Sequence, residues 1–142
     1  MRPDPLRLDD IRQYEVSARA HSGFPLSSRE FAGEANEQEW KFYVHSTETT
    51  VALRARLAME TPDASYVVDA VVRYRSATPF TAEPSVLQDF LNGEAMPTLY
   101  PFIREALHEA GRKIRAEAIL LGTYDPRASP IIVGADELDP AP

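Results

Sequence analysis

The chain has 142 residues, of which 44% are apolar and 26% charged, a composition typical of one folded domain and too apolar for a disordered chain. Its net charge of −7 would repel phosphate backbones, which argues against nucleic-acid binding. Because the sequence has no cysteine, no signal peptide and no run of about 18 apolar residues, we expect a cytoplasmic protein without disulfides, thiolate zinc sites or membrane insertion.

The first predicted element is a long strand from Leu6 to Ala20. Ile11 breaks its alternation, and a bulge near Asp9–Asp10 would let one strand carry both registers. The apolar residues at even positions, which the alternation places on one face, are Leu6, Leu8, Tyr14, Val16, Ala18 and Ala20.

A long connection is expected from His21 to Glu37, where glycine, proline and serine are frequent. It is unusually apolar for a loop, because it contains Phe24, Leu26 and Phe31. These side chains either cover an edge of the core, which is the commoner case, or line a binding surface.

Three further strands should form a meander. The first carries Trp40, Phe42 and Val44, the second alternates from Val51 to Met59, and the third from Tyr66 to Tyr74. The connections at 46–49 and 61–63 are short, so these strands must pair antiparallel, and the first strand completes a four-stranded sheet.

Helices follow the sheet. Ser85–Gln88 resembles a capping box that opens a short helix, which Asn92–Gly93 would stop. Thr98 can cap a longer helix that tolerates Pro101 in its first turn and has an apolar stripe continuing to Ala118. Small residues in this stripe permit close approach of another element, more often the sheet of the same domain than a partner subunit; they are Ala106, Ala110 and Gly111. The fold class is therefore α+β, with one domain over residues 1–134 and an acidic tail over 135–142 that we expect to be mobile.

The sequence contains no recognisable catalytic or cofactor motif. His21, His45 and His108 have no ligand spacing, and neither a phosphate-binding glycine loop nor a Gly-x-Ser-x-Gly elbow occurs. Asp9–Asp10 and the Glu105/Glu109 pair are typical of solvated charge. We therefore expect a binding protein that uses no cofactor or metal, and not an enzyme.

One heptapeptide resembles a known family. Leu99-Tyr-Pro-Phe-Ile-Arg-Glu105 is similar to the Leu-Phe-Pro-Tyr-Ala-Arg-Glu segment of SecB-type protein-export chaperones, and the order of elements from Leu6 to Leu121 agrees. The resemblance implies an antiparallel α+β domain assembled as dimers of dimers. Asp10 and Asp69 stand where the family carries acidic residues, so by resemblance they could form an acidic patch that docks a basic partner such as the export motor ATPase.

The chain departs from this family after its main helix. Ile119–Pro126 replaces the usual Phe-Pro-rich stretch, so the family's final helix is absent or remodelled. That departure suggests a divergent SecB-like branch, some of which chaperone an antitoxin in toxin–antitoxin systems.

The preferred function is an ATP-independent holdase for unfolded or nascent polypeptides, acting in protein export or on a dedicated client such as an antitoxin. The alternative is a small-molecule binding protein or enzyme with a cavity between sheet and helices. A homo-oligomer, dimer or tetramer, is expected. The candidate client-binding residues are Phe24, Leu26, Phe31, Trp40 and Phe42.

Overall fold

The computed structural model describes residues 6–21, 37–81, 83–114, 121–122 and 131. The chain first forms the strands β1 (Leu6–Ala20), β2 (Glu37–Ser46), β3 (Thr50–Glu60) and β4 (Ala64–Ser76). The helix α1 (Pro84–Phe90), the π-helical turn η2 (Leu91–Ala95) and the helix α2 (Met96–Lys113) follow. None of the helices described is long and apolar enough to cross a membrane.

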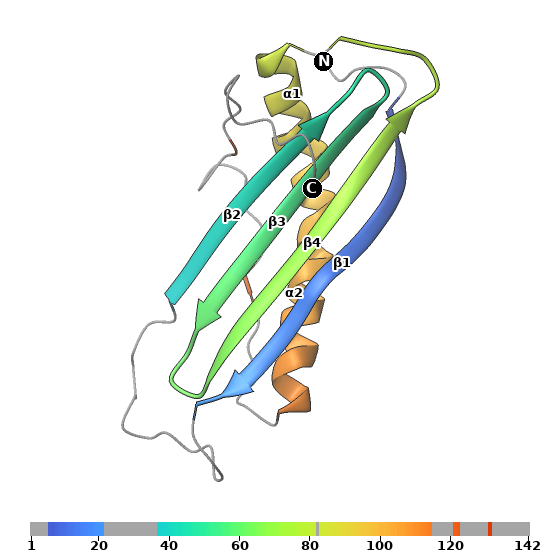
Figure 1. Ribbon diagram of the computed structural model, residues 1–142. Coiled ribbons are helices and arrows are strands. Elements are labelled where there is room, and N and C mark those ends of the chain that lie inside the picture. Colours follow the sequence, from blue (N-terminus) through green and yellow to red (C-terminus); the bar gives the residue numbers. More distant parts are fainter. Residues whose placement is uncertain (1–5, 22–36, 82, 115–120, 123–130, 132–142) are drawn as a thin grey trace.

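The strands form one antiparallel sheet in the order β1-β4-β3-β2, with the helices layered on one side of it (Figure 1). The predicted α+β fold, a four-stranded antiparallel sheet followed by C-terminal helix, is confirmed. Strand β1 pairs with β4, the last strand of the meander, so β1 and β2 are the two outer strands of the described sheet.

Strand β1 contains two register shifts against β4. The first lies between Leu8 and Asp10, as the broken alternation predicted. The second lies between Gln13 and Glu15 and was not predicted, because the alternation is unbroken there. This second bulge explains why Tyr14 does not share a face with Val16: the guanidinium of Arg54 lies over the Tyr14 ring, 5.0 Å from its centroid, on the side of the sheet away from the helices.

Alternate side chains of β3 and β4 fill the space between sheet and helices. The β3 residues from Val51 to Met59 and the β4 residues from Ala64 to Tyr74 that face the helices are at most 2% exposed. Helix α2 buries the stripe Leu99, Ile103, Ala106, Leu107, Ala110 and Gly111 against them. Burial of this apolar area, at about 25 cal/mol per Å², is the main force that holds helix and sheet together.

The small-residue stripe packs on the chain's own sheet. A Cβ atom added to Gly111 would lie 3.3 Å from the Tyr66 hydroxyl oxygen, tighter than ordinary contact. At Gly111 the element that approaches closely is therefore the sheet of the same domain, the commoner of the two interpretations.

The helix boundaries differ from those predicted. Helix α1 begins at Pro84 with Glu83 as its N-cap and no side-chain cap bond, because proline is pre-organised for the first helical position. Asn92–Gly93 does not stop the helix but lies inside η2, and Thr98 lies within α2 instead of capping it. Leu91 and Ala95 are fully buried, so tertiary packing outweighs the local signal for a stop. The Ala118 end of the stripe and the acidic tail at 135–142 lie outside the described residues.

Candidate functional site

Three aromatic side chains lie together where β2 meets α2. Trp40 and Phe42, two residues apart on the helix side of β2, stack with ring centroids 5.9 Å apart and an interplanar angle of 7°. Trp40 also stacks on Tyr100 of α2, at 6.0 Å and 22°. All three are only partly buried, and β2 is an outer strand of the described sheet. We call Trp40, Phe42 and Tyr100 the aromatic surface.

Two described residues that follow α2, Gly122 and Ile131, are hydrogen-bonded to the helices near this surface. The Tyr100 hydroxyl donates to the Gly122 carbonyl oxygen at 2.9 Å, and burial raises the pKa of this phenol, an effect that Arg104 partly offsets. The side-chain amide of Asn92 bonds both backbone groups of Ile131. Asn92 Nδ2 donates to the Ile131 carbonyl at 2.8 Å, and the Ile131 backbone N–H donates to Asn92 Oδ1 at 2.7 Å. Leu121 and Ile131 are each 5% exposed and belong to the hydrophobic core. These contacts cannot be predicted from the sequence alone, because the periodic pattern fades after Leu121.

Three candidate client-binding residues, Phe24, Leu26 and Phe31, lie outside the described residues. The ends of their connection are placed, however: Ala20 pairs with Ala64 and Glu37 with Glu60, on either side of the β3–β4 turn. The two described ends of the connection therefore lie on the outer strands at the same end of the sheet, about 14 Å apart for four strands.

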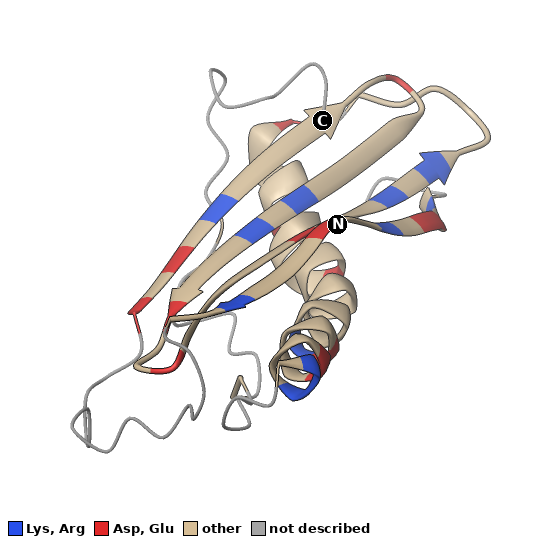
Figure 2. Cartoon of the chain, turned by 60° about the horizontal axis from the view of Figure 1, so that its bottom comes forward, with Lys and Arg blue, Asp and Glu red and all other residues tan. Residues whose placement is uncertain are grey.

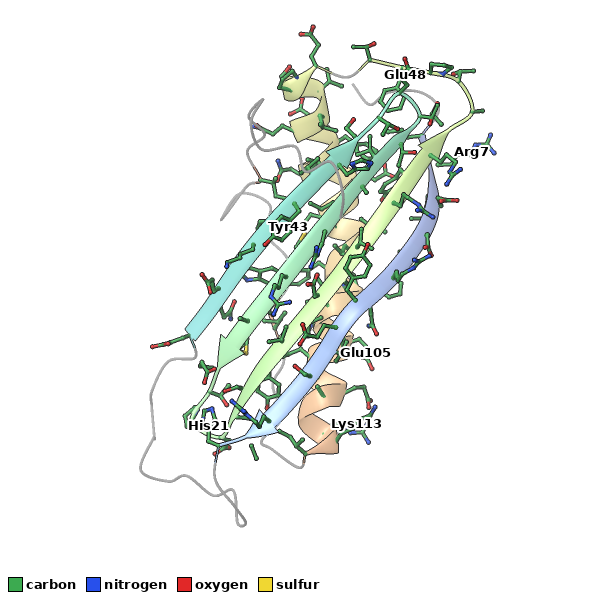
Figure 3. All side chains as sticks on the ribbon, in the orientation of Figure 1. Arg7, His21, Tyr43, Glu48, Glu105 and Lys113 are labelled. Atoms are coloured by element: carbon green, nitrogen blue, oxygen red, sulfur yellow. The ribbon has the colours of Figure 1, made fainter. Side chains whose placement is uncertain are left out.

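His21 fixes the start of that connection. Its backbone N–H donates to the Asp63 carbonyl at 2.9 Å, while its ring contacts the Pro62 carbonyl, the Glu60 carboxylate and the Ser65 hydroxyl. Figure 3 shows the His21 side chain at this end of the sheet. The described residues contain no cluster of three His, Asp or Glu side chains that could hold a metal ion.

Asp69 is the centre of a buried ion-pair network on the face of the sheet away from the helices, here called the open face. Its carboxylate accepts two hydrogen bonds from Arg54, at 2.9 and 2.8 Å, and one from Arg56 at 3.0 Å. Arg56 also bonds Glu15 at 3.0 Å. Burial alone would raise the pKa of Asp69, but the hydrogen bonds from the two arginines outweigh it and hold the pKa below its usual value.

Two tyrosine rings lie close to the Arg54 guanidinium. Its carbon lies 5.0 Å from the ring centroid of Tyr14 and 5.1 Å from that of Tyr43, separations that permit cation–π attraction to each ring. The bulge at Tyr14 therefore places its ring against Arg54, the residue that donates two hydrogen bonds to Asp69.

The acidic patch expected from Asp10 and Asp69 does not form. The Asp69 side chain is 1% exposed and paired with arginines, so its carboxylate is not presented to a partner. Asp10 is 33% exposed and pairs with Arg12 at 3.0 Å. It lies opposite Arg73, four residues along β4 from Asp69, which is about 13 Å. Figure 2 shows basic and acidic residues interspersed along the strands.

A groove of about 430 Å³ lies between β1 and α2, on the opposite side of the helix from the aromatic surface. Val16 and Phe102 within it are 40% and 47% exposed, and Glu105, Glu109 and Lys113 contribute its charged lining. Glu105 and Lys113 extend from α2 on the side of β1 (Figure 3). It is a surface groove, and the space between β3, β4 and α2 is filled by the core side chains described above.

No family model matches the chain, and no curated protein matches it in sequence. Among solved structures, it is similar to the Mycobacterium tuberculosis Rv1957 SecB-like chaperone in complex with a ChAD peptide from the Rv1956 HigA1 antitoxin. The TM-score is 0.65 at 14% identity, covering 84% of this chain and 88% of that one. A protein of unknown function from Streptococcus agalactiae is similar with a TM-score of 0.50 at 10% identity, covering 82% of this chain and 96% of the other. These likenesses show that the fold is SecB-like.

Proposed function

We propose that this chain is an ATP-independent chaperone that holds unfolded polypeptide segments, either export precursors or one dedicated client such as an antitoxin. The observation that carries the proposal is the aromatic surface, three partly exposed stacked rings at an outer strand. A protein of the same fold is a chaperone seen with an antitoxin peptide, which supports a polypeptide ligand here.

The chemistry of the aromatic surface suits a ligand of variable sequence. Trp40 satisfies its indole N–H locally, by donating to Gln38 Oε1 at 3.2 Å, so its ring can contact a ligand without a specific hydrogen-bond partner. Apolar contacts of modest energy tolerate many client side chains. The net charge of −7 keeps a protein with such a surface soluble.

Suppression of client aggregation tests the proposal. The purified chain should reduce light scattering from a chemically unfolded client without ATP, and replacing both Trp40 and Phe42 with serine should markedly weaken this protection. Tyr43→Ser is the matched control, since Tyr43 lies between these residues on β2 but faces the other side of the sheet. Equal protection by the double variant and the control would place the client surface elsewhere.

The undescribed connection needs its own variant. Phe24→Ser combined with Phe31→Ser should reduce protection while leaving the melting temperature nearly intact, if these side chains serve clients. A large fall in melting temperature would instead mark them as core residues. Purification of the wild-type chain from native lysate separates the two client classes, since many precursors indicate export and one antitoxin indicates a dedicated role.

We also propose that the groove between β1 and α2, with the outer edge of β1, is the contact in a homo-oligomer. The exposed Val16 and Phe102 would be covered by their counterparts in a second copy, because the two-fold contact of a dimer uses the same patch on both chains. A bound small molecule would be the alternative occupant, and soaking with metabolite pools followed by mass spectrometry distinguishes the two.

A further inference from the structure

Two helix side chains form hydrogen bonds to the backbone of the segment that follows α2. Asn92 bonds both the N–H and the carbonyl of Ile131, and Tyr100 donates to the carbonyl of Gly122. A side-chain amide that pairs with both backbone groups of one residue recognises polypeptide backbone and leaves the identity of that residue open. Such recognition suits ligands of variable sequence.

The Asn92 amide is held ready for this contact. Its Nδ2 also donates to the Gln88 carbonyl at 2.9 Å, which fixes the amide orientation so that Oδ1 faces the Ile131 N–H. Asn92 lies in the π-helical turn η2, and π-helical turns within α-helices occur frequently at functional sites.

These two helix residues adjoin the aromatic surface. Tyr100 both holds Gly122 and stacks on Trp40. Asn92 is eight residues before Tyr100, or about 12 Å along the helix axis, a distance that an extended polypeptide covers in about four residues.

The residue now bound there has the character of a chaperone client. Ile131 is 5% exposed within the hydrophobic core cluster, and its sequence context is Pro130-Ile-Ile-Val133. A short β-branched apolar segment of this kind is typical of what unfolded proteins expose.

We infer that Asn92, Tyr100 and the apolar core residues that cover Ile131 form a binding site for extended apolar polypeptide segments, and that the chain's own Ile131 occupies it until a client displaces it. This inference rests on the proposed chaperone function. Ile131 is a competitor, so the apparent client affinity is the intrinsic affinity multiplied by the fraction of molecules in which the site is free.

The test uses full-length chain carrying Ile131→Ser, which weakens the resident segment and leaves the helix residues intact. Binding is measured by fluorescence anisotropy with two labelled probes: an unfolded client, and a synthetic peptide of this chain's residues 129–134. We expect client affinity to rise several-fold, and the peptide to bind the variant but not the wild type. Adding Asn92→Ala to Ile131→Ser should abolish binding of the peptide.

Two further variants control the experiment. Tyr43→Ser also introduces serine, but on the face of β2 away from the helices, and should change neither affinity. Ile131→Ala should raise the affinities for client and peptide as Ile131→Ser does, but by a smaller factor. It replaces Ile131→Ser in the experiment if the serine variant does not fold.

The outcomes separate the inference from the function on which it rests. If the wild type protects clients but folded Ile131 variants bind client and peptide no better, the segment is only structural and the inference is overturned. If the peptide binds the Ile131→Ser variant through Asn92 while no unfolded client is protected, the site exists and the chaperone proposal fails.

Discussion

Replacing Asp69 with asparagine should destabilise the chain substantially, although asparagine has nearly the same shape. The substitution removes the charge that three hydrogen bonds from Arg54 and Arg56 neutralise, and keeps one acceptor oxygen. Hydrogen bonds to charged groups contribute about 1.5–3 kcal/mol each, and breaking a buried ion pair costs about 3–5 kcal/mol. The arginine side chains are 26% and 34% exposed and can regain water, so we expect a loss of about 2–3 kcal/mol.

Chemical unfolding followed by circular dichroism, at one fixed protein concentration, measures this loss. The control is Glu15→Gln, which removes a charge from the same network at a side chain that is 46% exposed and should cost about 0.5 kcal/mol or less. If Asp69→Asn and Glu15→Gln lowered the free energy of unfolding by similar amounts, burial of the Asp69 carboxylate would not explain its contribution.

The difference in stability between wild type and Asp69→Asn should depend on pH. The Asp69 pKa is lower in the folded than in the unfolded chain, so the stability it contributes is present at pH values above the unfolded pKa of about 4. That contribution is lost as the pH falls from there through the folded pKa. The difference between wild type and Asp69→Asn should therefore narrow in acid, and a difference that is constant from pH 7 to pH 3 would refute this explanation.

Two other predictions concern α2. Phe102→Glu should shift the mass measured by light scattering from oligomer toward monomer without lowering the stability of the fold, because Phe102 is 47% exposed; a wild-type chain that is monomeric at micromolar concentration would refute the proposed contact. Gly111→Leu should lower the free energy of unfolding by about 1–3 kcal/mol, since its side chain would press on Tyr66, and a variant as stable as wild type in denaturant titration would show that the helix shifts to accommodate it.

The sequence predicted the central strands well because their alternation is uninterrupted. From Val51 to Met59 and from Tyr66 to Tyr74 one face is apolar throughout, so a slip of one residue would expose the whole set. The first bulge was found because Ile11 breaks a pattern. The second was missed because Tyr14 is amphipathic and fits either face, and only the register against β4 shows that it lies over Arg54.

The candidate site was predicted only in part. Trp40 and Phe42 were found by alternation, but their partner Tyr100 belongs to an element 58 residues further on, and no local signal joins them. Asn92 next to Gly93 looked like a helix stop, because a sequence does not show that Leu91 and Ala95 will be buried. The pairing of Asp69 with Arg54 likewise requires knowledge of the β3–β4 register. Arg54 lies opposite Val71, which is two residues along β4 from Asp69.

The position of β1 in the sheet has a consequence for how the chain folds during synthesis. Its first residue pairs with the last residue of β4, Leu6 with Ser76, so this edge of the sheet can close only when 70 further residues have been made. At about 5–20 residues per second, this takes roughly 4–14 s. The β2–β4 meander has far shorter loops to close and should form first. Throughout that interval the nascent chain carries an unpaired strand of its own.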